Sequence, residues 1–209
     1  MQFDPLNSEG TSSHAGAGSA CGSAGRRSPH RQTGGRVLIV PGLHGSGPEH
    51  WQSRWQRLHP HFNRVAQADW NTPDLDAWAE RVAQALRASP EPVVVVAHSF
   101  GCLATVHALA LGAPNVAAAL LVAPADPCKF GVAKRLRVQA FAGPAILVGS
   151  SDDPWMASDR ARYWAAEWGV DFICAGALGH INADSGLGDW AFGLALLDTL
   201  TTESGLLYA

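Results

Sequence analysis

The chain has 209 residues, of which 47% are hydrophobic and 16% are charged. This length and composition suit one globular domain and argue against a disordered protein. The formal net charge of −3, without runs of Lys or Arg, indicates neither a nucleic-acid partner nor an anionic membrane surface. No apolar stretch approaches the roughly 20 residues that span a bilayer, and the start lacks the apolar core of a secretory signal. We therefore expect a cytoplasmic protein without membrane contact.

Residues 1–34 differ in composition from the rest of the chain. They are rich in Gly, Ser and Ala and contain almost no large apolar side chains. Such a segment cannot offset the entropy lost on ordering by burying apolar surface. We expect a disordered, low-complexity tail over residues 1–34 and a single folded domain over residues 35–209.

From Arg36 onward, segments typical of strands alternate with segments of helical periodicity. Strands are predicted at residues 37–40, 63–68, 93–97, 116–122, 145–148 and 170–174. Helices are predicted at residues 49–58, 72–89, 101–111, 158–168 and 190–200. The second helix would begin with Thr72 as the capping hydroxyl and Pro73 at the first helical position. Alternating helices and apolar strands predict an α/β fold, with a mostly parallel central sheet and helices on both faces.

The central motif is Ala97-His98-Ser99-Phe100-Gly101, which joins a predicted strand to a predicted helix. A serine on a sharp strand-to-helix turn, with small residues two positions to either side, is typical of a nucleophile elbow. Ala97 stands here in place of the usual glycine. The turn would put Ser99 at a helix N-terminus, where free N–H groups favour a developing negative charge. The alternative is a simple helix cap, because serine is a favoured N-cap residue.

A serine hydroxyl needs a base to become a nucleophile, and the base needs an acid to orient it. Of the nine histidines, His180 lies in the expected place, on a glycine-flanked loop after the last predicted strand. The turn at residues 149–154 supplies two candidate acids. The G-x-x-D pattern selects Asp152, whereas S-x-x-D-P selects Asp153, which we favour. For either aspartate, hydrogen bonding within the turn is the alternative role.

The loop at residues 41–47 follows the first predicted strand and is rich in glycine. An oxyanion hole needs two N–H donors aimed at the developing charge. We assign the backbone N–H groups of Phe100 and Leu43 to this role. A phosphate-binding loop is the alternative, but no G-K-[ST] follows and the G-x-G-x-x-G pattern lacks its third glycine.

The four cysteines, Cys21, Cys102, Cys128 and Cys174, are scattered along the chain and include no C-x-x-C pair. This spacing predicts free thiols rather than disulfides or a zinc site. No cluster of His and Asp has the spacing of metal ligands. The sequence therefore predicts neither a metal nor a cofactor.

Five stretches of the sequence carry a more specific pattern: VPGLHGSGPEHWQSRW (40–55), ADWNTPDLDAW (68–78), AHSFG (97–101), GSSDDPWM (149–156) and GHIN (179–182). Together they resemble the small serine hydrolases of the YdeN-like and retinoblastoma-binding-protein-nine-like family, over residues 36–200. The resemblance implies a compact α/β-hydrolase fold and a triad of Ser99, Asp153 and His180. It does not carry over retinoblastoma-protein binding, because the sequence contains no L-x-C-x-E motif.

The predicted substrate pocket draws on loops at the ends of strands, where ligands bind in parallel sheets. His44, Trp70 and Trp155 are its candidate residues, with ordinary packing as the alternative for both tryptophans. The segment at residues 126–141 is short where larger relatives insert a lid, so we expect an open site.

The sequence thus predicts hydrolysis of a small carboxylic ester, amide or thioester through an acyl-enzyme. Two rival interpretations remain. One is a binding protein of the same fold that has no catalytic activity. The other is an acyltransferase, in which an alcohol or amine replaces water. The sequence selects no oligomeric state.

Overall fold

The computed structural model describes residues 36–89, 91–138 and 140–206. The tail predicted over residues 1–34 lies outside these ranges. The described residues form a six-stranded sheet in the order β2-β1-β3-β4-β5-β6, and every neighbouring pair is parallel. The strands are β1 (Arg36–Val40), β2 (Asn63–Arg64), β3 (Val93–His98), β4 (Val116–Val122), β5 (Ala145–Gly149) and β6 (Asp171–Cys174). The predicted parallel α/β sheet is confirmed.

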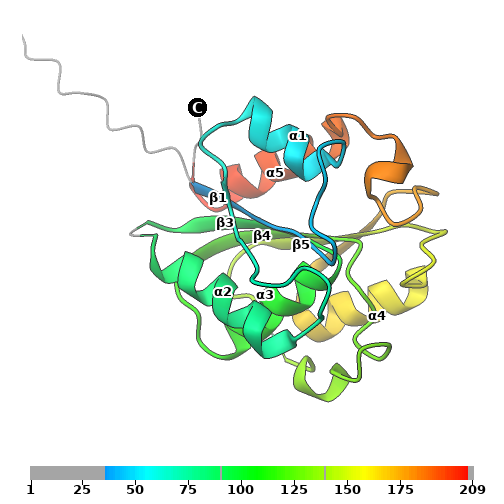
Figure 1. Cartoon of the computed structure of the whole chain (residues 1–209), viewed down its shortest axis with the longest axis horizontal. Helices are drawn as coiled ribbons and strands as arrows, with labels where there is room; N and C mark the ends of the chain where they lie inside the picture. Colours follow the sequence, from blue (N-terminus) through cyan, green and yellow to red (C-terminus); the bar gives the residue numbers. More distant parts are fainter. Residues whose placement is uncertain (1–35, 90, 139, 207–209) are drawn as a thin grey trace, which may run out of the picture. The chain divides into compact units, whose positions relative to one another are not determined.

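Helices cover both faces of this sheet (Figure 1). They are α1 (Trp51–Leu58), α2 (Leu75–Arg87), α3 (Phe100–Ala110), α4 (Ser158–Trp168) and α5 (Ala191–Glu203), with short 3-10 turns η1 (Ala133–Arg135) and η2 (Ala183–Ser185). Helices α1 and α5 lie on one face, and α2, α3 and α4 lie on the other. Within the described ranges, no helix is long and apolar enough to cross a membrane.

The apolar core consists of two layers, one on each face of the sheet. Strand β3 shows why its sequence is apolar throughout. Val94 and Val96 join the layer that contains α1 and α5, whereas Val93 and Val95 join the layer that contains α2, α3 and α4. Successive side chains of a strand point to opposite faces, so a strand covered on both sides needs apolar residues at every position.

Several predicted boundaries differ from the structure by a few residues, and two of these differences have a clear physical reason. The strand predicted at residues 63–68 is limited to Asn63–Arg64, with a last hydrogen bond of 2.9 Å from Val65 N–H to Ile39 O. Its partner β1 ends at Val40, so the following residues have no strand to pair with.

The second correction concerns the start of α2, which is capped by Asp74 rather than by Thr72. The Asp74 carboxylate accepts hydrogen bonds of 3.0 Å from the N–H groups of Asp76 and Ala77. A charged acceptor satisfies these free donors more strongly than a hydroxyl does. The helix therefore begins at Leu75, and Pro73 precedes it.

The topology brings two loops together at the carboxyl ends of the strands. Strands β1 and β3 are neighbours, but the chain leaving β1 enters α1 on one face, and the chain leaving β3 enters α3 on the other. Parallel sheets bind ligands at such a switch point, beyond the carboxyl ends of the strands. The loop after β1 and the turn at Ser99 therefore meet beyond the carboxyl ends of β1 and β3.

Candidate active site

Ser99 lies in the turn between β3 and α3, with φ 54° and ψ −126°. This backbone conformation is strained for a residue with a side chain. The turn can close because the two residues packed against it, Gly42 and Gly101, have no side chain. A Cβ on Gly101 would lie 2.6 Å from the Val40 carbonyl oxygen, and a Cβ on Gly42 would lie 2.6 Å from the Ser99 Cβ. The end of β1 and the elbow are thus in direct backbone contact.

The Ser99 hydroxyl faces a histidine. The serine occupies the N-cap position of α3, but its side chain makes no capping hydrogen bond. Its Oγ lies 2.9 Å from His180 Nε2, and His180 Nδ1 lies 3.0 and 2.9 Å from the two carboxylate oxygens of Asp153. Since an ionised carboxylate only accepts hydrogen bonds, Nδ1 carries the proton and the Nε2 lone pair faces the serine. This arrangement can remove the hydroxyl proton.

The two aspartates that compete as acids have different partners. Asp153 contacts His180, and its side chain is only 1% exposed. Asp152 instead accepts 2.7 Å hydrogen bonds from the Ser150 hydroxyl and from the Gly179 N–H. The Ser150 hydroxyl, followed by the Gly179 N–H, lowers the pKa of Asp152. The structure brings Asp153 to the imidazole and Asp152 to the backbone of the loop that carries it.

The two predicted oxyanion donors lie in the loops on either side of Ser99. Leu43 follows Gly42, whose Cα faces the Ser99 side chain, and Phe100 begins α3. Among the described residues, neither backbone N–H donates a hydrogen bond to a protein acceptor. Both are therefore free to bind an oxygen of a substrate.

Ser99 and His180 line a cavity of about 450 Å³. Its other walls include the apolar side chains Leu43, Ala125, Phe130 and Trp155 and the polar side chains His44, His50, His98, Asp126, Lys129, Asn182 and Asp184. The short segment at residues 126–141 contributes Asp126, Lys129 and Phe130. Burial is the largest single influence and raises the pKa of the Asp126 carboxyl. The hydrogen bonds from Arg160 and the Cys128 N–H, together with the charges of Arg160 and Lys129, outweigh it, so the pKa is lowered.

The predicted pocket residues have different places. His44 and Trp155 line the cavity, and the Trp155 side chain is 54% exposed at its edge. Trp70 does not belong to the lining. Its ring packs edge-on against Trp78, with centroids 5.5 Å apart, and its carbonyl accepts a 2.8 Å hydrogen bond from the His44 N–H. Trp70 therefore supports the loop after β1 from behind.

Sequence reasoning missed two buried histidines in the cavity wall, His50 and His98. His50 Nδ1 accepts a 3.2 Å hydrogen bond from the Gln52 N–H and so caps α1. His98 Nε2 lies 2.9 Å from the His180 carbonyl oxygen. Burial lowers the pKa of His50 to about 3 and holds that of His98 well below its usual value. Both rings are neutral at ordinary pH. Their positions beside the H-W-Q and H-S motifs were the available signal.

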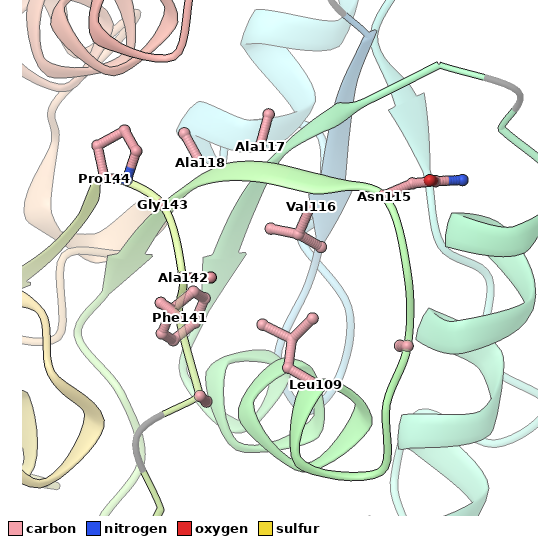
Figure 2. A pocket seen from close by; sticks show the side chains of 11 residues that line it. Leu109, Asn115, Val116, Ala117, Ala118, Phe141, Ala142, Gly143 and Pro144 are labelled. Carbon is pink, nitrogen blue, oxygen red and sulfur yellow. The ribbon is translucent and has the colours of Figure 1, made fainter.

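A second cavity, of about 150 Å³, lies at the amino end of β4 (Figure 2). The turn at Ser99 follows the carboxyl end of the neighbouring strand β3, so the two lie at opposite ends of the strands. Leu109, Val116 and Phe141 form much of its wall. None of the described residues lining it has a nucleophilic or titratable side chain. The cavity at Ser99 instead brings a hydroxyl, an imidazole and a carboxylate together, so we place the candidate site there. Over the described ranges, no group of three or more His, Cys, Asp or Glu side chains could hold a metal ion.

Comparison with known proteins identifies the family of the chain. The profile of a family described as Serine hydrolase matches residues 37–199. The chain belongs to the serine hydrolase family. Among solved structures, a protein described as a YdeN-like hydrolase, from Pectobacterium atrosepticum SCRI1043, is 38% identical to this member, with a TM-score of 0.77 over 84% of this chain and 94% of that chain. The resemblance to YdeN-like hydrolases of the α/β-hydrolase superfamily is thereby confirmed.

More distant structures share the fold. The ydeN gene product from B. subtilis is 18% identical, with a TM-score of 0.68 over 80% of this chain and 99% of that chain. The esterase RhEst1 from Rhodococcus sp. ECU1013 is 12% identical, with a TM-score of 0.58 over 82% of this chain and 92% of that chain. A search of curated proteins finds no match.

Proposed function

We propose that this family member cleaves small carboxylic esters through an acyl-enzyme, with Ser99 as nucleophile, His180 as base and Asp153 as orienting acid. The observation that carries the proposal is the continuous chain of hydrogen-bonding contacts from Asp153 through both ring nitrogens of His180 to Ser99 Oγ. The absence of a capping bond from the Ser99 hydroxyl supports it as well, because the hydroxyl is left to the imidazole.

The first half of the reaction acylates the serine. Ser99 Oγ attacks the ester carbonyl carbon while its proton moves to His180 Nε2, and the negative charge develops on the carbonyl oxygen. The N–H groups of Leu43 and Phe100 stabilise that oxygen. The tetrahedral intermediate then expels the alcohol, which takes the proton from Nε2. Asp153 stays ionised and stabilises the imidazolium.

The second half regenerates the enzyme. A water molecule attacks the acyl carbon and gives its proton to His180 Nε2. Collapse of the second intermediate releases the carboxylic acid, and Ser99 recovers its proton. Amides and thioesters would follow the same route with a different leaving group.

The cavity supports a small acyl or alcohol group as the ligand. Its volume of about 450 Å³ lies in the lower part of the range of small-molecule sites. Phe130 and Trp155 offer apolar contact area, whereas Lys129 and Asp184 give the wall a polar portion. These features favour a compact ester over a long acyl chain.

A fluorophosphonate probe tests the proposal, because it reacts with activated serines. We expect peptide mass spectrometry to locate the label on Ser99 and Ser99→Ala to abolish it. Ser89→Ala is the matched control: this buried hydroxyl donates a structural hydrogen bond of 2.8 Å to Glu91 O, and its loss should leave labelling intact. Turnover of p-nitrophenyl acetate should fall at least ~10³-fold in Ser99→Ala.

A folded wild-type protein that takes no label would overturn the catalytic proposal and favour a binding protein. Adding alcohols or amines to the p-nitrophenyl acetate reaction separates hydrolysis from acyl transfer. Acetic acid as the main product supports hydrolysis, whereas an acetylated acceptor as the main product would make the protein an acyltransferase.

A further inference from the structure

The loop that carries His180 has strained backbone. Ile181, directly after the base, has φ 46° and a fully buried side chain. A positive φ is strongly disfavoured for a β-branched residue, and such a conformation persists only where the surroundings hold it. The loop is therefore not held by its own conformational preference, and its contacts must supply the restraint.

Two side chains from distant elements donate to successive carbonyl groups of this loop. His98 Nε2, at the end of β3, lies 2.9 Å from His180 O. Trp51 Nε1, at the start of α1, lies 2.8 Å from Ile181 O. A carbonyl oxygen only accepts, so His98 Nε2 carries a proton, and an indole N–H is always a donor. The base is thus held on its C-terminal side by two hydrogen bonds of fixed direction.

Both donors are themselves fixed by packing. The residues Trp51 and His98 are 1% and 5% exposed. The His50 ring lies edge-on to His98 at 4.7 Å and is 5.2 Å from Trp51. Rigid, buried aromatic donors lose little rotamer freedom when they bind, so they can restrain a strained loop.

We propose that His98 and Trp51 are positioning residues that hold His180 Nε2 within hydrogen-bonding distance of Ser99 Oγ by binding the carbonyls of His180 and Ile181. The inference rests on the proposed function for its activity readout. A shift of about 1 Å in a reacting group can cost roughly 10²-fold in rate. Loosening the loop would therefore lower kcat, and because Trp51 lies outside the cavity lining, removing its donor does so without changing the cavity walls.

Four variants test the proposal. His98→Leu and Trp51→Phe each remove one donor while keeping an apolar side chain. His98→Gln is the conservative rescue, because the amide nitrogen of Gln can occupy the place of Nε2. Trp55→Phe is the matched control: Trp55 is on the same helix and equally buried, and its Nε1 donates a 2.7 Å hydrogen bond to Asp189 O, outside the His180 loop.

Steady-state turnover of p-nitrophenyl acetate should show kcat reduced ~10- to 100-fold in His98→Leu and Trp51→Phe, with KM nearly unchanged in Trp51→Phe, because Trp51 does not line the cavity. His98→Gln should recover most of kcat, and Trp55→Phe should match the wild type in kcat while losing a similar amount of thermal stability. Equal kcat in Trp51→Phe and Trp55→Phe, together with wild-type kcat in His98→Leu, would overturn the proposal.

Amide hydrogen exchange over residues 178–182 reads the loop without turnover. We expect faster exchange in His98→Leu and Trp51→Phe than in Trp55→Phe, with His98→Gln close to the wild type. An unreactive wild-type protein would defeat the proposed function, yet the exchange contrast would still decide whether the two donors hold the loop. Uniform exchange in all four variants would defeat the inference alone.

Discussion

The elbow at Ser99 and the loop at His180 both contain positive-φ residues, yet different interactions hold them. At the elbow, φ is 54° at Ser99, and close backbone packing with Gly42 and Gly101 encloses the turn. At the loop, φ is 46° at Ile181, and side-chain donors supply the restraint. These donors lie 82 and 130 residues away from the carbonyls that they bind. Ser99 is held by sterics, and the loop that carries His180 is held by long-range hydrogen bonds.

The largest expected effect concerns the region of His180 and distinguishes the roles of its two neighbouring aspartates, Asp153 and Asp152. Asp153→Asn replaces the acceptor for His180 Nδ1–H with an amide, which cannot stabilise the imidazolium and favours the wrong tautomer. We expect kcat for p-nitrophenyl acetate to fall by about 10⁴-fold. Steady-state kinetics near neutral pH measures this loss.

Asp152→Asn is the matched control. Its amide oxygen can still accept from the Ser150 hydroxyl and the Gly179 N–H, so kcat should change at most ~10-fold. Asp152→Ala removes both hydrogen bonds and should cost more than Asp152→Asn does. A larger loss in Asp152→Asn than in Asp153→Asn would transfer the role of acid to Asp152.

The next largest effect concerns the close backbone packing around the turn at Ser99. Gly101→Ala places a Cβ 2.6 Å from the Val40 carbonyl oxygen, in a backbone contact that cannot relax cheaply. We expect the free energy of unfolding to fall by about 1–3 kcal/mol or more. Urea denaturation measures it, provided that the m-value stays constant.

Gly47→Ala provides the control for the elbow, since a Cβ at Gly47 meets no atom within 4 Å. Its stability should stay within about 0.5 kcal/mol of the wild type. Similar stability losses in the two variants would mean that close packing is not what restricts the elbow to glycine at position 101.

The comparison also explains what the sequence could predict. Strand β4 and helix α4 have the predicted bounds, because an apolar strand buried on both faces and a helical repeat are local patterns. The elbow is local as well, since its strand, serine and glycine lie within one short segment. Short-range sterics therefore made Ser99 recognisable.

The remaining features depend on long-range contacts. Trp51 stands in a recognisable motif, but no local pattern indicates that its indole binds Ile181 O. Trp70 and Trp155 both follow strands, yet one packs behind a loop and the other lines the cavity. Only the assembled fold decides which way each ring points.

A smaller effect concerns the pH dependence of stability that comes from His50, whose ring packs against His98 and Trp51. Burial lowers the pKa of His50 from 6.5 to about 3. Between these values the unfolded chain binds a proton that the folded protein does not, so stability falls as pH drops below 6.5. One such proton is worth up to about 1.4 kcal/mol per pH unit. His50→Asn keeps an acceptor for the helix cap but removes this titration.

Urea denaturation of both proteins at several pH values between 4.5 and 7.5 measures the difference, with the pH range spanning the ordinary histidine pKa of about 6.5. We expect the wild type to lose stability more steeply on acidification than His50→Asn. His98 remains in both proteins, and burial, the main cause of its lowered pKa, acts on it in both. Parallel curves would mean that folded His50 takes up a proton as readily as the unfolded chain does.

The smallest expected effect concerns the rim of the cavity. The Trp155 side chain lines the cavity, and its ring centroid lies 6.4 Å from that of His180. Trp155→Ala should weaken binding of p-nitrophenyl esters by about 1 kcal/mol, which raises KM ~5-fold. Its backbone N–H still donates to Asp153, so kcat should hold. Phe192→Ala, which removes a similarly exposed ring from α5 outside the cavity lining, should leave KM unchanged. A fall in kcat with constant KM in Trp155→Ala would instead mean that this ring helps to hold His180, and the base would then depend on its rim as well as on its two buried donors.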